Sequence, residues 1–227
     1  MPAFDRYAVY WLPKGPLSDW GQALLGRDVT TGKVLSRPDV TGLPADIMTL
    51  TAEPARYGLH ATIKPPFRLA QGAEPAALNA ALAKVCAGQA DIELDALELR
   101  SLDGFLALVP QGDTAALDAM AGAVVAELDS FRAPASDAEL ARRRAGGLTA
   151  RQDAHLIRWG YPYVMEDFRF HVTLTGRLPP DQITPTVAAL VPHLAPRLPV
   201  PVRLGGLALM GQAADGFHRI AHHDFSG

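Results

Sequence analysis

The sequence contains one series of elements twice, and this repetition limits the folds that the chain can adopt. Each copy predicts a strand carrying His-x-Thr, then a helix, then a hairpin. The first anchor pairs His60 and Thr62 with His171 and Thr173. Ile92, Leu94, Leu97 and Leu99 match Val202, Leu204, Leu207 and Leu209, and Asp103-Gly104-Phe105 matches Asp215-Gly216-Phe217, at nearly the same spacing. We expect two related lobes whose equivalent strands meet about a pseudo-two-fold axis.

The repetition predicts an α+β fold with one bilobal domain over residues 1–227. Its first His-x-Thr unit spans about 56–112, its second about 169–227, and a bridge covers about 131–168. The turn at Asp103-Gly104 is a strong hairpin signal. The remaining expected elements are a strand over 4–12, a helix from Ser18 to Leu25, a loop-rich segment over 27–57, helices over 75–87, 114–130, 137–145 and 150–159, and a last helix starting at Thr184-Pro185 that Pro192 shortens or kinks.

Composition excludes several classes of protein. A chain of 227 residues with 48% hydrophobic residues can bury a sizeable core, so disorder is not expected. A net charge of −3 gives no global attraction to duplex DNA or to an anionic membrane. The single cysteine, Cys86, excludes an internal disulfide and is expected to be a small buried hydrophobe. No apolar run near the start is long enough for a signal or a membrane span, and we expect a cytoplasmic monomer.

The His-x-Thr spacing predicts a catalytic arrangement. Side chains two apart on a strand point to the same face, so each motif presents an imidazole beside a hydroxyl. Histidine gains or loses a proton near neutral pH, and two opposed histidines can act as acid and base on a phosphodiester without a metal. We therefore expect His60 and His171 to be catalytic and Thr62 and Thr173 to bind the phosphate oxygens. This mechanism predicts a bell-shaped pH profile with limbs around neutrality.

The two motifs, with RYGLHATIKPPF at 56–67 and WGYPYVMEDFRFHVTLTG at 159–176, resemble the 2H phosphoesterases, a superfamily that includes LigT-like proteins. The flanking sequence is most similar to the subfamily encoded beside bacterial phosphonate-degradation genes. The resemblance implies a duplicated two-lobe fold in which antiparallel sheets line a central cleft and helices lie outside. It also implies metal-independent opening of a cyclic phosphate, or the reverse ligation, on a small ribose cyclic phosphate, a nucleotide or a short RNA end. No cofactor is implied.

Other side chains near the motifs are candidates for substrate binding. Lys64 and Arg169 lie two residues from a motif and carry the positive charge that a phosphate needs, although both types are also common as solvated strand residues. Tyr57 and Tyr163 are candidates for a base or sugar pocket, and aromatic packing explains them equally well. The basic run from Arg142 to Arg144 is either a solvated helix face or part of the cleft rim.

Two other functions compete with the esterase. One is a module that binds a nucleotide or phosphate ester without turning it over; the presence of all four motif residues disfavours it. The other is a metal hydrolase that uses the two motif histidines as ligands, but neither motif offers a third ligand. His218, His222 and His223 also suggest a metal, without a carboxylate at good spacing. We expect no metal site.

Overall fold

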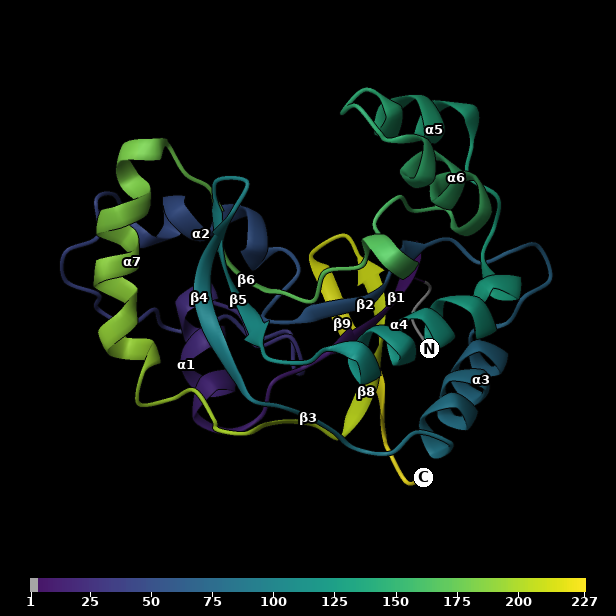
Figure 1. Cartoon of the computed structure of the whole chain (residues 1–227), viewed down its shortest axis with the longest axis horizontal. Helices are drawn as coiled ribbons and strands as arrows, with labels where there is room; N and C mark the ends of the chain where they lie inside the picture. The colour runs from purple at the N-terminus through teal and green to yellow at the C-terminus, as the bar shows by residue number, and fades with distance from the viewer. Residues whose placement is uncertain (1–3) are drawn as a thin grey trace.

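The computed structural model describes residues 4–227, and its centre is a seven-stranded sheet in the order β4-β5-β6-β2-β1-β8-β9 (Figure 1). Every pairing in it is antiparallel. Its strands are β1 (Arg6–Trp11), β2 (Ala61–Phe67), β4 (Ala96–Leu102), β5 (Phe105–Gln111), β6 (Val172–Arg177), β8 (Gly206–Ala213) and β9 (Gly216–Asp224), and β3 (Ile92–Leu94) pairs with β7 (Val202–Leu204) in a second, small sheet. The predicted α+β class is confirmed.

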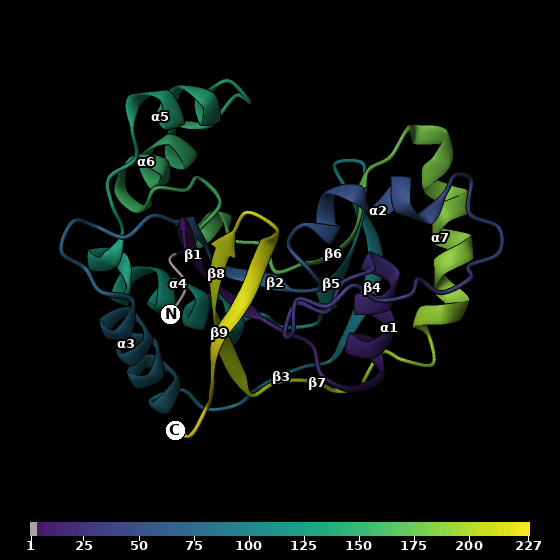
Figure 2. The same ribbon diagram turned by 180° about the vertical axis from the view of Figure 1, so that it is seen from behind.

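Helices pack outside both ends of the sheet (Figures 1 and 2). They are α1 (Gly15–Leu25), α2 (Ile47–Ala55), α3 (Pro75–Ala87), α4 (Ala115–Glu127), α5 (Asp137–Arg144), α6 (Ala150–Trp159) and α7 (Pro180–Leu194), with 3₁₀ turns η1 (Asp129–Phe131) and η2 (Met165–Asp167). The end with β4, β5 and β6 is covered by α1, α2 and α7, and the other end by α3 and α4. The pair α5 and α6 projects from one corner of the molecule.

The two ends of the sheet meet at one residue pair. β2 and β6 are joined in register at Ala61 and Val172, the middle residues of the two His-x-Thr motifs. In the small sheet, Ile92 pairs with Leu204 and Leu94 with Val202. Matching strands of the sequence repeat therefore pair with each other in both sheets, and each pairing is centred on one matched pair, Ala61 with Val172 and Glu93 with Arg203. This is the pairing that a pseudo-two-fold axis through the junction predicts.

The sequence units are exchanged between the two ends of the sheet. The β4–β5 hairpin belongs to the first unit in sequence, yet β5 pairs with β6 of the second. The β8–β9 hairpin of the second unit lies beside β1, which pairs with β2 of the first. Each half of the sheet is thus built from both units, whereas the sequence predicted contiguous lobes. The crossing is physically possible because β3 and β7 run between the halves as a paired ribbon.

The sheet has one face in the main core and another with a smaller core. On β1, Val9 and Trp11 are buried in the main cluster with the helices, whereas Ala8 and Tyr10 belong to a second cluster with Phe217. Successive residues thus enter different clusters, as in a strand whose two faces are both buried. The motif histidines lie on the second face, where His60 stacks on Tyr10.

Most predicted helices are confirmed within a few residues of their expected ends. Both capping boxes, Ser136 with Glu139 and Thr149 with Gln152, are formed. The hairpin turn is confirmed, with φ of 48° at Asp103. Cys86 is fully buried and burial raises its pKa to about 11, as expected for a small core residue.

The helices differ from the sequence predictions at three places. α2 falls in the segment expected to be loop; its cap Asp46 accepts a hydrogen bond from the Met48 backbone, and the prolines around it hid this signal. α1 begins at Gly15 instead of Ser18. α7 begins at Pro180, passes through Pro185 and continues beyond Pro192, so Thr184 is not its cap. Tertiary packing on β4 and β5 holds α7 despite the two missing amide donors.

Candidate active site

The junction of β2 and β6 brings the two His-x-Thr motifs together. Ala61 and Val172 are fully buried, and their side chains point into the main core. Their neighbours in sequence alternate to the other face, where His60, Thr62, His171 and Thr173 are only partly buried. Antiparallel pairing centred on Ala61 and Val172 sets His60 beside Thr173 and Thr62 beside His171. Two imidazoles and two hydroxyls therefore surround one position.

Both histidines are oriented in the same way by the backbone. The Nδ1 of His60 lies 2.8 Å from the Gly58 carbonyl oxygen, and the Nδ1 of His171 lies 2.7 Å from the Arg169 carbonyl oxygen. Because a carbonyl only accepts, each neutral ring donates from Nδ1 and keeps its lone pair on Nε2. The Nε2 of His60 lies 3.0 Å from the Thr62 hydroxyl, which donates to it. In each motif Nε2 thus carries the lone pair that can accept a proton, and in His60 this lone pair accepts the Thr62 hydroxyl.

His60 is surrounded by aromatic rings. The Tyr10 ring stacks on the His60 imidazole, with centroids 3.8 Å apart and planes at 23°, and the Tyr57 centroid is 6.3 Å away. Burial lowers the pKa of His60 to about 4, with a smaller contribution from the nearby His171, while the bond to the Gly58 carbonyl opposes both. His60 is therefore neutral at pH 7, the state in which it can accept a proton.

His171 is more open to solvent than His60. Its nearest ring is Phe105 of β5, with centroids 5.7 Å apart. Arg169 precedes it by two residues and is exposed. The sequence did not predict Phe105 and Tyr10 as residues of the site, because only the strand pairing shows that they flank the histidines.

Lys64 requires a correction. Strand alternation predicted that it would follow His60 and Thr62 on one face. The pairing of β1 with β2 instead has an irregularity: Tyr10 pairs with Thr62, but Val9 pairs with Lys64, so Ile63 is an extra residue. Because of this bulge, the side chains that follow Ile63 point to the opposite face of the sheet from the one that alternation predicts.

The reversal sends the Lys64 side chain into the core. Its Nζ donates to the Val125 carbonyl at 2.9 Å, near the C-terminus of α4, and lies 5.3 Å from the centroid of the Phe67 ring. The residue is 2% exposed, and burial lowers its pKa to about 8. An ammonium at a helix C-terminus is a stabilising arrangement. Lys64 is therefore a structural residue and is not available to a ligand.

Tyr57, Tyr163 and one arginine of the basic run each pack on an aromatic ring. Tyr57 stacks on Phe217 at 5.6 Å, which places it in the second core cluster. Tyr163 is 48% exposed and meets Tyr161 edge-on. The Arg143 guanidinium lies 4.6 Å from the centroid of Tyr161. In the basic run, Arg144 pairs with Asp153 and Arg142 is exposed. Arg143 is the residue of the run that packs on the Tyr161 ring.

The histidines near the C-terminus do not form a metal centre. His218 bonds Asp215, His222 bonds Asp224 and His223 bonds Asn79, so each has its own partner. Within residues 4–227 no three His, Cys, Asp or Glu side chains are grouped as metal ligands. In the same range no helix has the length and apolarity that crossing a bilayer requires.

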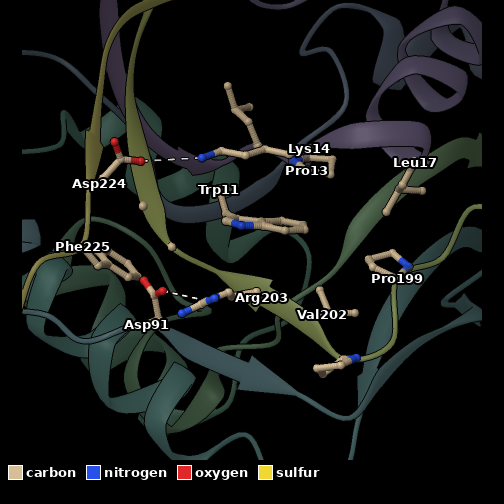
Figure 3. A pocket seen from close by; sticks show the side chains of 14 residues that line it. Trp11, Pro13, Lys14, Leu17, Asp91, Pro199, Val202, Arg203, Asp224 and Phe225 are labelled. Atoms are coloured by element: carbon tan, nitrogen blue, oxygen red, sulfur yellow. Dashed lines mark ion pairs between the residues drawn. The ribbon is translucent and has the colours of Figure 1, made fainter.

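A cavity of about 530 Å³ lies elsewhere, between the end of β1 and the small sheet (Figure 3). Trp11 and several prolines line it. Two ion pairs stand at its rim, Lys14 with Asp224 at 3.6 Å and Arg203 with Asp91 at 2.7 Å. None of the residues predicted for the site lines this cavity.

Residues 62–218 match a family described as "Protein of unknown function (DUF1045)". The chain belongs to this family. It is 41% identical over 179 residues to the ribose 1,5-bisphosphate phosphokinase PhnN of Janthinobacterium sp. (strain Marseille), a match that covers 78% of this chain and 40% of that protein. The protein of the same name from Laribacter hongkongensis is 37% identical over 213 residues, covering 93% and 49%. The chain thus spans less than half the length of these curated relatives.

Solved structures also align over nearly the whole chain. A crystal structure of a phosphoesterase covers 99% of this chain, with 11% identity and a TM-score of 0.43. A crystal structure of E. coli LigT complexed with NADP+ covers 99%, with 10% identity and a TM-score of 0.45.

Proposed function

We propose that this chain is a phosphoesterase that opens a small cyclic phosphate or cleaves a 2′-linked phosphodiester by two-histidine acid/base catalysis. The observation that carries the proposal is the pairing of Ala61 with Val172, which sets His60, Thr62, His171 and Thr173 around one position. In both histidines the Nδ1 bond to a carbonyl leaves Nε2 for proton transfer. The substrate phosphate occupies the space between the two rings.

The neutral state of His60 supports separate roles for the two histidines. His60 is neutral at pH 7, so it accepts the proton of the attacking water through Nε2. The new bond forms between the water oxygen and phosphorus, and the bond from phosphorus to the ring oxygen breaks. His171, on the opposite strand, gives its proton to that leaving oxygen. The product is a ring-opened monoester, and the reaction leaves His60 with a proton and His171 without one. Proton exchange with solvent restores both histidines.

The threonines stabilise the charge that develops on the phosphate. Their hydroxyls are hydrogen-bond donors, and charge-assisted bonds to phosphate oxygens strengthen as charge accumulates. Arg169 is exposed beside His171 and is the cation that we propose for the same phosphate. Tyr57, close to His60, is proposed to flank the sugar or base, and Tyr163 to lie at the outer edge of that pocket.

The substrate is proposed to be a small ribose cyclic phosphate. The resemblance to the phosphonate-associated subfamily implies such a substrate. The relatives also support this substrate, because two of them are named for ribose 1,5-bisphosphate. Each of these relatives is about twice as long as this chain. The kinase activity in that name is not proposed here. The phosphate-binding loop G-x-x-x-x-G-K-[ST] is absent from the sequence; Gly26 to Lys33 comes nearest, but it has one residue too many and Val34 follows the lysine.

The test is a screen of ribose and nucleoside cyclic phosphates in the presence of a chelator, with the product isomer identified. His60→Asn and His171→Asn are assayed beside the wild type, and substrate binding is measured separately by calorimetry. We expect each variant to lose turnover by about 10²–10⁴ while still binding substrate. Binding by the wild type with no turnover of any substrate would favour the binding module. Activity that disappears with chelator and returns with zinc or manganese would favour the metal hydrolase.

A further inference from the structure

A small cavity beside the bridge is lined by four arginines and one carboxylate. It has a volume of about 50 Å³ and lies where the start of β1 and the end of β2 meet the bridge segment. The charged residues that line it are Arg6, Arg68, Arg132, Arg143 and Glu139. Four positive charges thus meet one negative charge, although the chain as a whole carries a net charge of −3. Such a local concentration of guanidinium groups attracts an anion.

Two of these arginines are neutralised by acidic side chains. Arg68 pairs with Glu139 at 2.7 Å, and Arg132 pairs with Asp129 at 2.8 Å. Their backbones are also joined, because the Ala133 amide donates to the Arg68 carbonyl at 2.8 Å. Arg68 and Arg132 therefore form a fixed wall of the cavity, and the excess positive charge comes from the other two arginines.

The charges of Arg6 and Arg143 are not neutralised in this way. In the part of the chain that the structure describes, residues 4–227, neither of them forms an ion pair. Arg6 donates through its Nε to the Gln212 side chain, and the Arg143 guanidinium lies 4.6 Å from the centroid of the Tyr161 ring. Both arginines are partly buried, so salt and water screen their charges less than on an open surface. The bond to Gln212 uses one of the five N–H donors of Arg6, and the others remain for a ligand.

The size of the cavity fits one phosphate group. A water molecule needs roughly 10–15 Å³ of such space, so a cavity of about 50 Å³ has room for roughly three to five atoms of oxygen size. Phosphate carries four oxygens, and guanidinium groups bind them through paired, charge-assisted hydrogen bonds.

The cavity is separate from the proposed reacting position. β1 pairs with β8 without a shift from Arg6 to Tyr10, so Arg6, Ala8 and Tyr10 share one face of the strand. His60 stacks on Tyr10, which lies about 13 Å along the strand from Arg6. Ala8, between them, is fully buried, so neighbouring side chains cover the sheet there. A ligand in the cavity therefore occupies a second site.

We infer that this cavity binds a single phosphate group, held by Arg6 and Arg143. The group is inorganic phosphate or the terminal phosphate of a small ester, since both present the same oxygens. Its negative charge offsets the mutual repulsion of the guanidinium groups, so binding stabilises the folded chain. The inference does not depend on the proposed function, because a phosphate at this distance takes no part in proton transfer.

The experiment measures the binding of inorganic phosphate by calorimetry, at one ionic strength set with sodium chloride. The wild type is compared with Arg6→Gln, Arg143→Ala and Arg142→Ala. Arg142 is a matched control, because it precedes Arg143 in α5, is exposed and does not line the cavity. We expect Arg6→Gln and Arg143→Ala each to weaken binding about 10- to 100-fold, and Arg142→Ala to change it by less than about 2-fold. Urea midpoints in chloride alone verify that each variant is folded.

Two further measurements identify where the phosphate binds and where it comes from. Arg169→Met is included, because phosphate at the proposed reacting position depends on that residue. Ribose 5-phosphate replaces inorganic phosphate in a parallel series, and whichever of the two binds more tightly through Arg143 is the ligand of the site.

The outcomes separate this site from the proposed function. If binding depends on Arg6 and Arg143 while no cyclic phosphate is hydrolysed, the proposed function falls and the site stands. Phosphate binding that is lost in Arg169→Met but unchanged in Arg143→Ala would overturn the site even if hydrolysis is observed. Equal effects of Arg142→Ala and Arg143→Ala, or no binding of either ligand, would also overturn it.

Discussion

The Tyr10 ring stacks on the His60 imidazole with centroids 3.8 Å apart, and this contact buries one side of the histidine that we propose as the base. Tyr10 is fully buried, so it shields one whole side of the imidazole from water. Desolvation disfavours the imidazolium, which is the main reason that the pKa of His60 falls to about 4. The two motifs are alike in sequence, but their aromatic neighbours differ: Tyr10 stacks on His60, whereas Phe105 lies beside His171.

The first prediction concerns the pH profile. Since His60 must be neutral, the acid limb of kcat/KM is expected below pH 6.5, toward 4, instead of near neutrality as the motifs alone suggested. Tyr10→Ala opens the stacked side to water and should move this limb upward. Tyr10→Phe keeps the ring and should leave it in place. The measurement is kcat/KM against pH for the three proteins, and identical acid limbs in wild type and Tyr10→Ala would contradict the role of burial.

The second prediction is a loss of stability in acid. The pKa of His60 is about 4 in the folded chain and near 6.5 when unfolded, so the unfolded state binds more protons between these values. The contribution of neutral His60 to stability is therefore fully present above pH 6.5 and is lost as the pH falls toward 4. Urea midpoints across this range should fall less steeply for His60→Asn than for the wild type. Parallel curves would show that His60 is not desolvated.

The third prediction tests the corrected position of Lys64. Its ammonium bonds the Val125 carbonyl inside the core, so Lys64→Met should change kcat/KM by less than about 3-fold, because no contact with the substrate is removed. The substitution should instead change the unfolding free energy, because it removes a buried hydrogen bond and, at the same time, the cost of burying a charge. Arg169→Met is the comparison, since that exposed residue is proposed to meet the phosphate. A large loss of turnover in correctly folded Lys64→Met would restore its catalytic role.

Much of the arrangement was predictable because it depends on local periodicity. The capped helices over the bridge and the Asp103-Gly104 turn follow from short-range rules, and the repeat predicted that equivalent strands would meet. What could not be predicted depends on pairings between distant segments. The bulge at Ile63, which turns Lys64 inward, is set by the register with β1. Likewise, no local sequence pattern predicts that the two units exchange their hairpins.

The same limit explains the site residues that the sequence did not reveal. Tyr10 lies 50 positions before His60, and Phe105 lies 66 before His171, so only the order of strands relates them. Neither belongs to a His-x-Thr motif. By contrast, His60 and Thr62 are two apart on one strand, and the period of a strand is enough to place them together.

The last prediction separates the two threonines. Thr62 donates to the Nε2 of His60 at 3.0 Å, whereas His171 has, within the residues that the structure describes, a hydrogen bond only to the Arg169 carbonyl. A donor on Nε2 favours the neutral ring, so Thr62→Val should raise the pKa of His60 and move the acid limb of kcat/KM upward. Thr173→Val should leave that limb in place.

Both variants should also lose transition-state stabilisation, by about 1–3 kcal/mol for a lost bond to a charged phosphate. Valine keeps the shape and the strand preference of threonine, so unchanged urea midpoints serve as the control for folding. An upward shift of the limb in both variants would mean that the threonines act alike on their histidines. A shift in neither would mean that the Thr62 hydroxyl turns to the phosphate and does not set the protonation of His60.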